Sequence, residues 1–127
     1  MKANQQNPHL SEEQKRVLFG ADTEMPFTGK LLKNKKTGIY TCANCGHELF
    51  KSQTKFDSGS GWPSFYEPIN SEVVNLIKDN THGMERVEAT CANCGAHMGH
   101  VFYDAPEQPT GLRFCINSAS LDFKETK

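Results

Sequence analysis

The hexapeptide Thr41-Cys42-Ala43-Asn44-Cys45-Gly46 occurs a second time, letter for letter, at residues 90–95. Each copy is a Cys-x-x-Cys-Gly turn, which directs two thiolates to one point, and its glycine allows a positive φ at little cost. Two such knuckles supply the four sulfur ligands of a closed tetrahedral zinc site. These ligands are Cys42, Cys45, Cys91 and Cys94. Iron accepts the same ligands and is the main competing metal. A closed site predicts a structural metal, which leaves Cys115 for chemistry.

Length and composition limit the possible functions. The 127 residues fit one domain with a modest core, which a zinc site would reinforce. We expect a polar leader over residues 1–10 and a single domain over 11–127. The net charge of −1 gives no strong field for nucleic acid or an anionic membrane, and no segment resembles a signal peptide or a bilayer span. Five cysteines, four of them in Cys-x-x-Cys pairs, are typical of a metal plus a free thiol in a reducing compartment. We therefore expect a cytoplasmic monomer.

Local signals predict a small, mainly antiparallel β domain with an N-terminal helix. Ser11 and Gln14 form a capping-box pattern, which predicts a helix over 11–19 that ends at Gly20. Short runs between turn residues predict strands over 38–42, 48–50, 71–77, 86–91, 100–103 and 113–118. The 71–77 run would also suit a short helix. In this arrangement the shared metal ion links two hairpins that are distant in the sequence.

Cys115 lies in a run that predicts a strand with two different faces. Alternate residues of a strand share a face, so Leu112, Phe114 and Ile116 should point one way. Arg113, Cys115 and Asn117 should point the other way. A free cysteine is often a small core residue, but here the apolar side chains occupy the opposite face. A neighbouring cation favours the thiolate, and the amide could orient a substrate or a histidine. We therefore interpret Cys115 as a nucleophile.

Two further segments carry candidate site residues. His97 and His100 follow the second knuckle, and a bend at Gly99 could bring both rings to one cavity, where either could transfer a proton. Ordinary surface histidines remain the alternative. Trp62 lies in a glycine-rich turn between Phe56 and Phe65. These aromatic rings could form a wall for a methyl or sulfonium-like group, or anchor the core instead.

With these residues assembled, the chain resembles the methionine-R-sulfoxide reductases. The resemblance rests on the two knuckles and on three further segments, and it extends over nearly the whole chain. The segments are Ser-Gly-Ser-Gly-Trp-Pro-Ser-Phe, His-Met-Gly-His-Val-Phe and Arg-Phe-Cys-Ile-Asn-Ser-Ala-Ser-Leu. It implies a fold of two antiparallel sheets, called a β-tent, with the zinc away from the active site. The implied activity is reduction of methionine-R-sulfoxide in oxidised proteins.

The same resemblance implies roles for individual residues. Cys115 resembles the nucleophile that becomes a sulfenic acid, and Arg113 resembles the arginine beside it. His97, His100 and Asn117 resemble the polar cluster around the sulfoxide oxygen, whereas Trp62 resembles the wall for the ε-methyl group. Many relatives carry a resolving cysteine where this chain has Ser60. We therefore expect thioredoxin or a small thiol to reduce Cys115 directly.

Two other functions compete with this interpretation. A zinc-ribbon binding module would explain the knuckles, but it gives Arg113, Cys115 and Asn117 no role, and the balanced charge argues against nucleic acid. A cysteine hydrolase would pair Cys115 with a histidine, but it needs an oxyanion hole, for which the sequence has no clear candidate.

Overall fold

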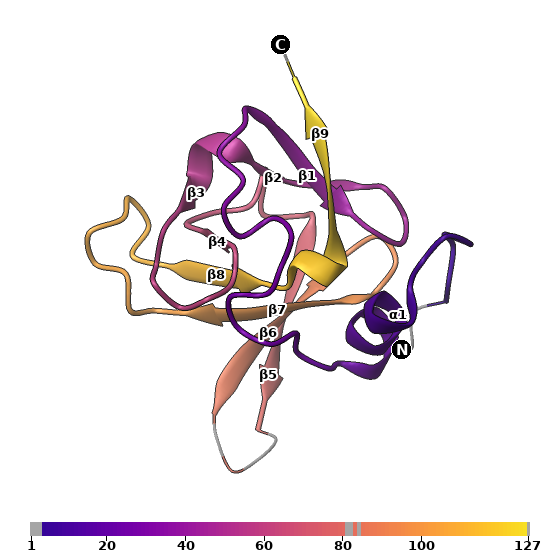
Figure 1. The fold of residues 1–127 in the computed structure, drawn as a ribbon. Coiled ribbons are helices and arrows are strands. Elements are labelled where there is room, and N and C mark those ends of the chain that lie inside the picture. The colour runs from indigo at the N-terminus through magenta and orange to yellow at the C-terminus, as the bar shows by residue number, and fades with distance from the viewer. Residues whose placement is uncertain (1–3, 81–82, 84, 127) are drawn as a thin grey trace.

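The computed structural model describes residues 4–80, 83 and 85–126, which form two antiparallel sheets and one α-helix (Figure 1). The three-stranded sheet has the order β2 (Glu48–Lys51), β1 (Gly38–Cys42) and β9 (Leu121–Glu125). The six-stranded sheet has the order β3 (Lys55–Phe56), β4 (Ser64–Phe65), β8 (Arg113–Ile116), β7 (His97–Phe102), β6 (Arg86–Cys91) and β5 (Val74–Asp79). The predicted mainly β fold with two antiparallel sheets is confirmed. Within the described residues, no helix has the length and apolar character needed to cross a bilayer.

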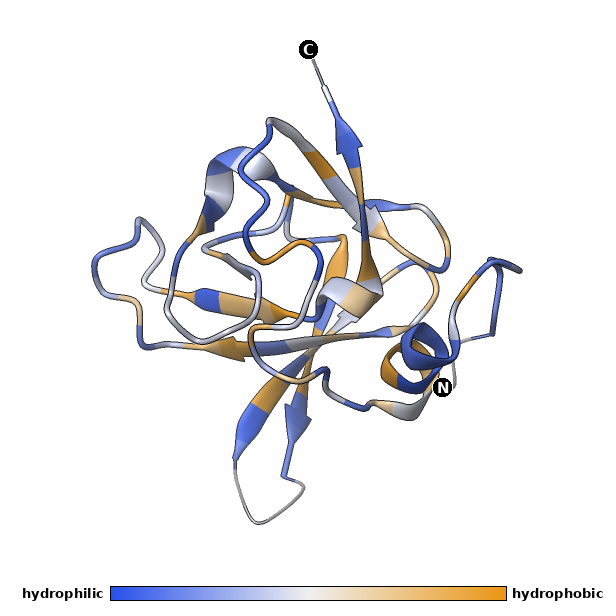
Figure 2. Ribbon diagram, in the orientation of Figure 1, coloured by the Kyte–Doolittle hydropathy of each residue, from blue (hydrophilic) through white to orange (hydrophobic). Residues whose placement is uncertain are grey.

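The main core lies where the two sheets meet. Tyr40 of β1 and Phe50 of β2 are fully buried, and both rings contact Phe65 of β4, at centroid distances of 5.1 and 4.4 Å. Phe50 also contacts Phe114 of β8 edge-on at 5.9 Å. Hydrophobic residues lie along the central strands, while the outer ends of β5 and β9 are hydrophilic (Figure 2). Edge-to-face and stacked ring pairs of this kind stabilise a core beyond their buried area.

Helix α1 (Glu12–Gly20) begins as the sequence predicts. The Ser11 side chain accepts a hydrogen bond from the Gln14 amide, and the Gln14 side chain accepts one from the Ser11 amide, which completes the capping box. Val17 and Leu18 are buried, and the helix contacts β7 and the 3₁₀ helix Ser118–Ser120. The helix ends at Gly20, as predicted, and the next residue, Ala21, adopts the left-handed cap conformation with φ 54°.

The six predicted strands are present in the two sheets, although the ends of several differ from the prediction. Strands β1 and β6 have the predicted bounds, and β2 is one residue longer. The 71–77 run forms a strand rather than a helix, but it is displaced to Val74–Asp79, where it pairs with β6. The predicted 100–103 strand begins at His97, and the 113–118 strand ends at Ile116. Strands β3, β4 and β9 were not predicted, because two are only two residues long and β9 is mostly polar.

The predicted polar leader is attached to the first knuckle. The Asn44 side chain accepts a hydrogen bond from the Gln6 amide at 2.6 Å and donates one to the Asn4 carbonyl at 2.9 Å. Asn7 donates to the Ala43 carbonyl at 2.8 Å, and Leu10 is buried. Residues 4–10 are therefore fixed to the domain rather than separate from it. The first three residues of the predicted leader lie outside the described residues.

Candidate active site and metal centre

The two knuckles bring four thiols to one point. Their sulfur atoms all lie within 4.8 Å of one another. Two pairs, each joining one knuckle to the other, are separated by 3.7 Å (Cys42 and Cys94) and 3.6 Å (Cys45 and Cys91). In a tetrahedral site with metal–sulfur bonds of about 2.3 Å, neighbouring sulfurs are about 3.8 Å apart. The predicted ligand set therefore forms a cluster that can hold a metal ion.

Local backbone geometry and electrostatics both fit a cation in this cluster. Gly46 and Gly95 adopt φ values of 79° and 82°, so each chain turns back and its amide donates to the carbonyl of the first cysteine. A hydrogen bond with Cys91 and burial raise the pKa of Cys42, and burial raises the pKa of Cys94. A bound cation would oppose these upward pKa shifts, because it stabilises deprotonated thiols directly.

Cys115 lies on the polar face of the six-stranded sheet, as the alternation predicts. Phe114 and Ile116 are buried in the core cluster and Leu112 packs against it, whereas Cys115 is not part of that cluster. The Cys115 sulfur lies 3.2 Å from Arg113 Nη1 and 3.3 Å from Ser60 Oγ, and the residue is 8% exposed. The thiol therefore contacts a cation and a hydroxyl group while keeping a small opening to solvent.

Arg113 is held in place beside the thiol from two directions. Its Nε and Nη2 atoms donate to the two carboxylate oxygens of Asp104, each at 2.9 Å. Its guanidinium also lies over the Phe102 ring, 4.4 Å from the centroid. The hydrogen bonds to Asp104 raise the pKa of Arg113 and lower the pKa of Asp104. Arg113 is therefore a fixed positive charge, and Asp104 is a site residue that the sequence did not reveal.

The two histidines share the polar face with Cys115. His100 lies directly opposite Cys115 in the β7–β8 ladder, and directly opposite Glu88 in the β6–β7 ladder. His97 is three residues away, an odd spacing that places residues on opposite faces of a regular strand. The β6–β7 register shifts at this point, which is the signature of a bulge, and the two rings meet at a centroid distance of 5.5 Å. The predicted common site for both rings is formed by this bulge.

Each imidazole ring contacts a carboxylate. His97 Nδ1 lies 2.6 Å from Glu88 Oε2, and His100 Nε2 lies 2.9 Å from Asp79 Oδ2. Burial lowers the pKa of His97, and the neighbouring Glu88 opposes this shift. His97 Nε2 is buried and has no hydrogen-bond partner among the described residues. The polar alternation Arg86-Val87-Glu88-Ala89 is the sequence signal that could have identified Glu88.

Asn117 has a different environment from the one the sequence suggests. Its side-chain oxygen accepts a hydrogen bond from the Glu24 amide at 3.0 Å, and its Nδ2 donates to the Met98 carbonyl at 3.0 Å. Glu24 in turn accepts from the Ala119 amide through Oε1 and from the Trp62 indole through its carbonyl, both at 2.9 Å. Glu24 therefore links Asn117 to Trp62, and no local sequence pattern indicated this role.

The three aromatic residues predicted to bind substrate lie in different places. Trp62 is half-buried and close to the site, because its amide lies 3.4 Å from Ser60 Oγ. Phe56 is half-buried and lines a groove next to Trp62. Phe65 is fully buried and stacks on Phe50 in the core. The prediction that Phe65 contacts substrate is therefore corrected: neighbouring residues of a strand face opposite ways, and Ser64 takes the face of Cys115.

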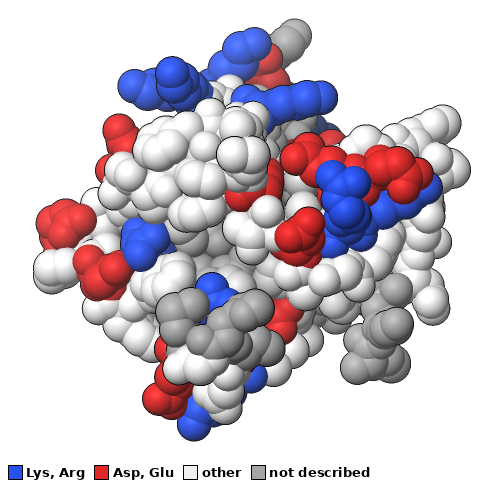
Figure 3. Space-filling model, turned by 60° about the horizontal axis from the view of Figure 1, so that its bottom comes forward, with Lys and Arg blue, Asp and Glu red and all other residues white. Residues whose placement is uncertain are grey.

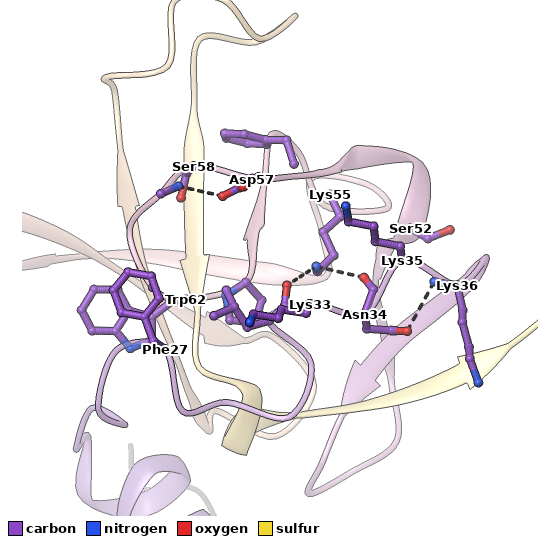
Figure 4. Close-up of a pocket in the computed structure, with 15 residues that line it drawn as sticks. Phe27, Lys33, Asn34, Lys35, Lys36, Ser52, Lys55, Asp57, Ser58 and Trp62 are labelled. Carbon is purple, nitrogen blue, oxygen red and sulfur yellow. Dashed lines mark hydrogen bonds between the residues drawn. The ribbon is translucent and has the colours of Figure 1, made fainter.

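A groove of about 760 Å³ runs between segment 27–36 and loop 52–63 (Figure 4). We call it the lysine groove. Figure 4 shows Phe27 and Trp62 at one end and Lys35 and Lys36 toward the other. Lys55 fixes its wall by donating to the carbonyls of Leu32 and Asn34 at 2.8 and 3.1 Å. Cys115 does not line it, so the groove adjoins the thiol site through Trp62.

Comparison with known proteins identifies the family. The SelR domain matches residues 10–125. Peptide methionine sulfoxide reductase MsrB of Leptospira interrogans is 59% identical over 116 residues, which cover 91% of this chain and 88% of the relative. The protein of the same name from Escherichia coli K12 is 56% identical over 123 residues, covering 97% and 89%. These matches, over nearly the whole chain, show that the chain belongs to the SelR-domain family, the methionine-R-sulfoxide reductases of the B type.

Proposed function

We propose that this enzyme reduces methionine-R-sulfoxide in oxidised proteins through a sulfenic acid on Cys115. The observation that carries the proposal is the position of the Cys115 sulfur, 3.2 Å from Arg113 Nη1 and directly opposite His100 in the ladder. The thiolate is the nucleophilic form of cysteine, and the fixed guanidinium group of Arg113 contacts this sulfur. A histidine on the same face can supply the proton that sulfoxide reduction requires.

The proposed reaction transfers one oxygen atom between two sulfur atoms. The Cys115 thiolate attacks the sulfoxide sulfur, and the sulfoxide oxygen becomes basic as its bond to that sulfur weakens. A protonated imidazole then donates to this oxygen. The oxygen then forms a bond to the Cys115 sulfur, while the bonds from the methionine sulfur to this oxygen and to Cys115 both break. Methionine leaves with the electron pair that restores its thioether, and Cys115 is left as a sulfenic acid, so methionine is reduced and the cysteine is oxidised.

His100 is the better proton donor of the two histidines in this proposal. It lies opposite Cys115, and its Nε2 contacts the Asp79 carboxylate. His97 is more buried, and burial lowers its pKa, so at neutral pH its ring is mainly neutral. We assign His97 the role of a neutral neighbour that helps to orient the oxygen. Trp62 would hold the methyl group. The contact of Trp62 with the methyl group and the contact of the histidines with the oxygen would together select the R configuration at sulfur.

The residue next to Cys115 determines how the sulfenic acid is reduced back to the thiol. Ser60 Oγ lies 3.3 Å from the Cys115 sulfur, at the position for which the family resemblance implies a resolving cysteine. A hydroxyl group cannot form a disulfide, and the four other cysteines belong to the metal cluster. We propose that thioredoxin or a small thiol attacks the sulfenic acid directly. Two reductant thiols then become one disulfide, with release of water and the free Cys115 thiol.

We propose that the metal is zinc, that it is structural, and that the protein works as a cytoplasmic monomer. Four thiolate ligands close the coordination shell, so zinc would stabilise the fold without taking part in the reaction. The five cysteines are not paired in disulfides, which fits a reducing compartment.

Reduction of the two epimers of N-acetyl-methionine sulfoxide with dithiothreitol tests this function. We expect consumption of the R epimer alone, and loss of activity in Cys115→Ser. Circular dichroism and metal content serve as controls, because this substitution leaves the metal cluster intact. Turnover of the S epimer alone, or full activity of Cys115→Ser, would overturn the proposal.

A further inference from the structure

The lysine groove carries a concentrated positive charge, although the whole chain has a net charge of −1. Lys33, Lys35 and Lys36 line it and are exposed. Lys36 lies 3.8 Å from Glu125, whereas Lys33 and Lys35 have no ion-pair partner among the described residues. Asp57 is the acidic residue of the lining, and its side chain accepts a hydrogen bond from the Gly59 amide. Figure 3 shows Lys and Arg side chains gathered along one edge of the molecule.

A fourth lysine adds to the field of the groove. Lys55 is half-buried, with its ammonium group bound to two backbone carbonyls. Burial lowers its pKa and Lys35 adds to this effect, while Asp57 opposes it. Four lysines and one aspartate therefore line one concave surface. Such a surface attracts an acidic partner, because a concave surface lined by one sign of charge focuses the electrostatic potential.

The other end of the groove is aromatic and exposed. Phe27 is 68% exposed and adopts φ 68°, a conformation that is strained for a bulky residue. Its amide donates to the Gly61 carbonyl at 2.7 Å, and its ring packs where a Gly61 side chain would be. This contact holds Phe27 next to the turn that carries Trp62. An exposed aromatic ring held in this way suits a contact with a polypeptide chain.

The aromatic end is close enough to the thiol for one peptide to reach both. Ser60 Oγ lies 3.3 Å from the Cys115 sulfur and 3.4 Å from the Trp62 amide, so that amide is within about 7 Å of the sulfur. An extended peptide advances roughly 3.3 Å per residue, so a few residues lead from the thiol into the groove.

From this arrangement we propose that the lysine groove binds the polypeptide segment that flanks the methionine sulfoxide, and that it favours acidic segments. The inference rests on the proposed function and narrows its substrate class. The sulfoxide residue would enter between Cys115 and Trp62, the adjoining backbone would cross Phe27, and acidic side chains a few residues away would meet Lys33, Lys35 and Lys36.

Matched peptides test this inference. Each contains one methionine-R-sulfoxide, with three aspartates or three lysines placed about three to five residues before or after it. We expect wild type to reduce one of the aspartate peptides with a kcat/KM about three- to tenfold above its lysine counterpart, since exposed ion pairs contribute modestly. The preference should decrease as salt shortens the screening length. Dithiothreitol is the reductant, so binding of thioredoxin does not enter the measurement.

Two double variants with the same change in net charge provide the control. Lys33→Gln/Lys35→Gln should lose most of the preference for the aspartate peptide. Lys15→Gln/Lys78→Gln, which neutralises a half-buried lysine on α1 and an exposed lysine on β5, should keep it. All three proteins should reduce N-acetyl-methionine-R-sulfoxide equally, because this small substrate has no flanking residues that could reach Lys33 or Lys35.

The outcomes separate the inference from the proposed function. Absence of a preference in wild type, or an equal loss in both double variants, would overturn the groove assignment while activity on the small substrate remained. A defect of the groove variant that appears only with thioredoxin would also overturn it, because the groove would then bind the reductant. Failure of wild type to reduce the small substrate would instead contradict the proposed function.

Discussion

Gly99→Ala should separate the two strands that carry the histidines and the thiol. A Cβ atom on Gly99 would overlap the carbonyl oxygen of Cys115 and lie only 3.0 Å from the Ile116 Cα. Both obstacles are backbone atoms, so no side-chain rotation relieves the overlap and β7 must move away from β8. Two hydrogen bonds to the Met98 carbonyl, from the amide and the side chain of Asn117, lie next to this contact. Overpacking and weakening of these bonds together should cost about 2–4 kcal/mol.

The same displacement should affect the reaction more than a general loss of stability would. His100 lies directly opposite Cys115, so a strand shift of about 1 Å changes the distance over which the proton moves. Misplacement on this scale can lower the rate by up to about 100-fold. Urea unfolding measures the first effect. The second is measured as kcat/KM for N-acetyl-methionine-R-sulfoxide, at a temperature where the variant is folded.

Gly20→Ala is the matched control for this prediction. No atom lies within 4 Å of the corresponding Cβ position, and Gly20 is the last residue of α1. Alanine is the better helix former, so stability should stay the same or rise by up to about 1 kcal/mol, with unchanged activity. If Gly99→Ala matched this control in both stability and kcat/KM, the proposed close packing of β7 on β8 would be refuted.

Three further changes probe other parts of the molecule. Burial raises the pKa of Glu24 above its ordinary 4.5, so the folded state loses stability as pH rises from 4.5 through the higher folded value. In Glu24→Gln this pH-dependent component of the free energy of unfolding should disappear. If the free energies of unfolding of both proteins changed equally with pH between about 4 and 8, this prediction would be contradicted. Ser60→Cys should form a disulfide with Cys115 after turnover, because Ser60 Oγ already lies 3.3 Å from the sulfur; non-reducing peptide mapping detects it, and a free Cys115 would speak against this geometry. Cys42→Ser should release the metal and lower Tm by more than about 10 °C, whereas retention of both would disprove the ligand assignment.

The parts of the structure that the sequence predicted have short-range causes. The capping box of α1, the knuckle turns and the alternation of Phe114, Cys115 and Ile116 each depend on residues within a few positions of one another. The pattern in each case matches one backbone geometry. The two knuckles each carry two thiols at chelating spacing, and this pattern also leaves few alternatives to a shared metal ion.

The missed features depend on contacts between distant segments. Glu24 meets Asn117 and Ala119 across more than ninety residues, and Asp104 meets Arg113 through a loop whose course the sequence does not reveal. The bulge between His97 and His100 arises from the pairing of β7 with β6. The predicted bend at Gly99 is therefore close to the observed bulge, but its cause, a shift in strand register, was not predicted. Phe65 was misplaced because its strand is two residues long, too short for an alternation pattern.

In the proposed reaction Cys115 alone accepts the oxygen, without a partner thiol in the chain. Mass spectrometry after one turnover with methionine-R-sulfoxide, in the absence of reductant, shows directly whether this is so. We expect one equivalent of methionine and one added oxygen on the peptide that contains Cys115, which a sulfenic-acid reagent such as dimedone traps. A disulfide between Cys115 and any of the four knuckle cysteines, or formation of methionine with Cys115 unmodified, would contradict it.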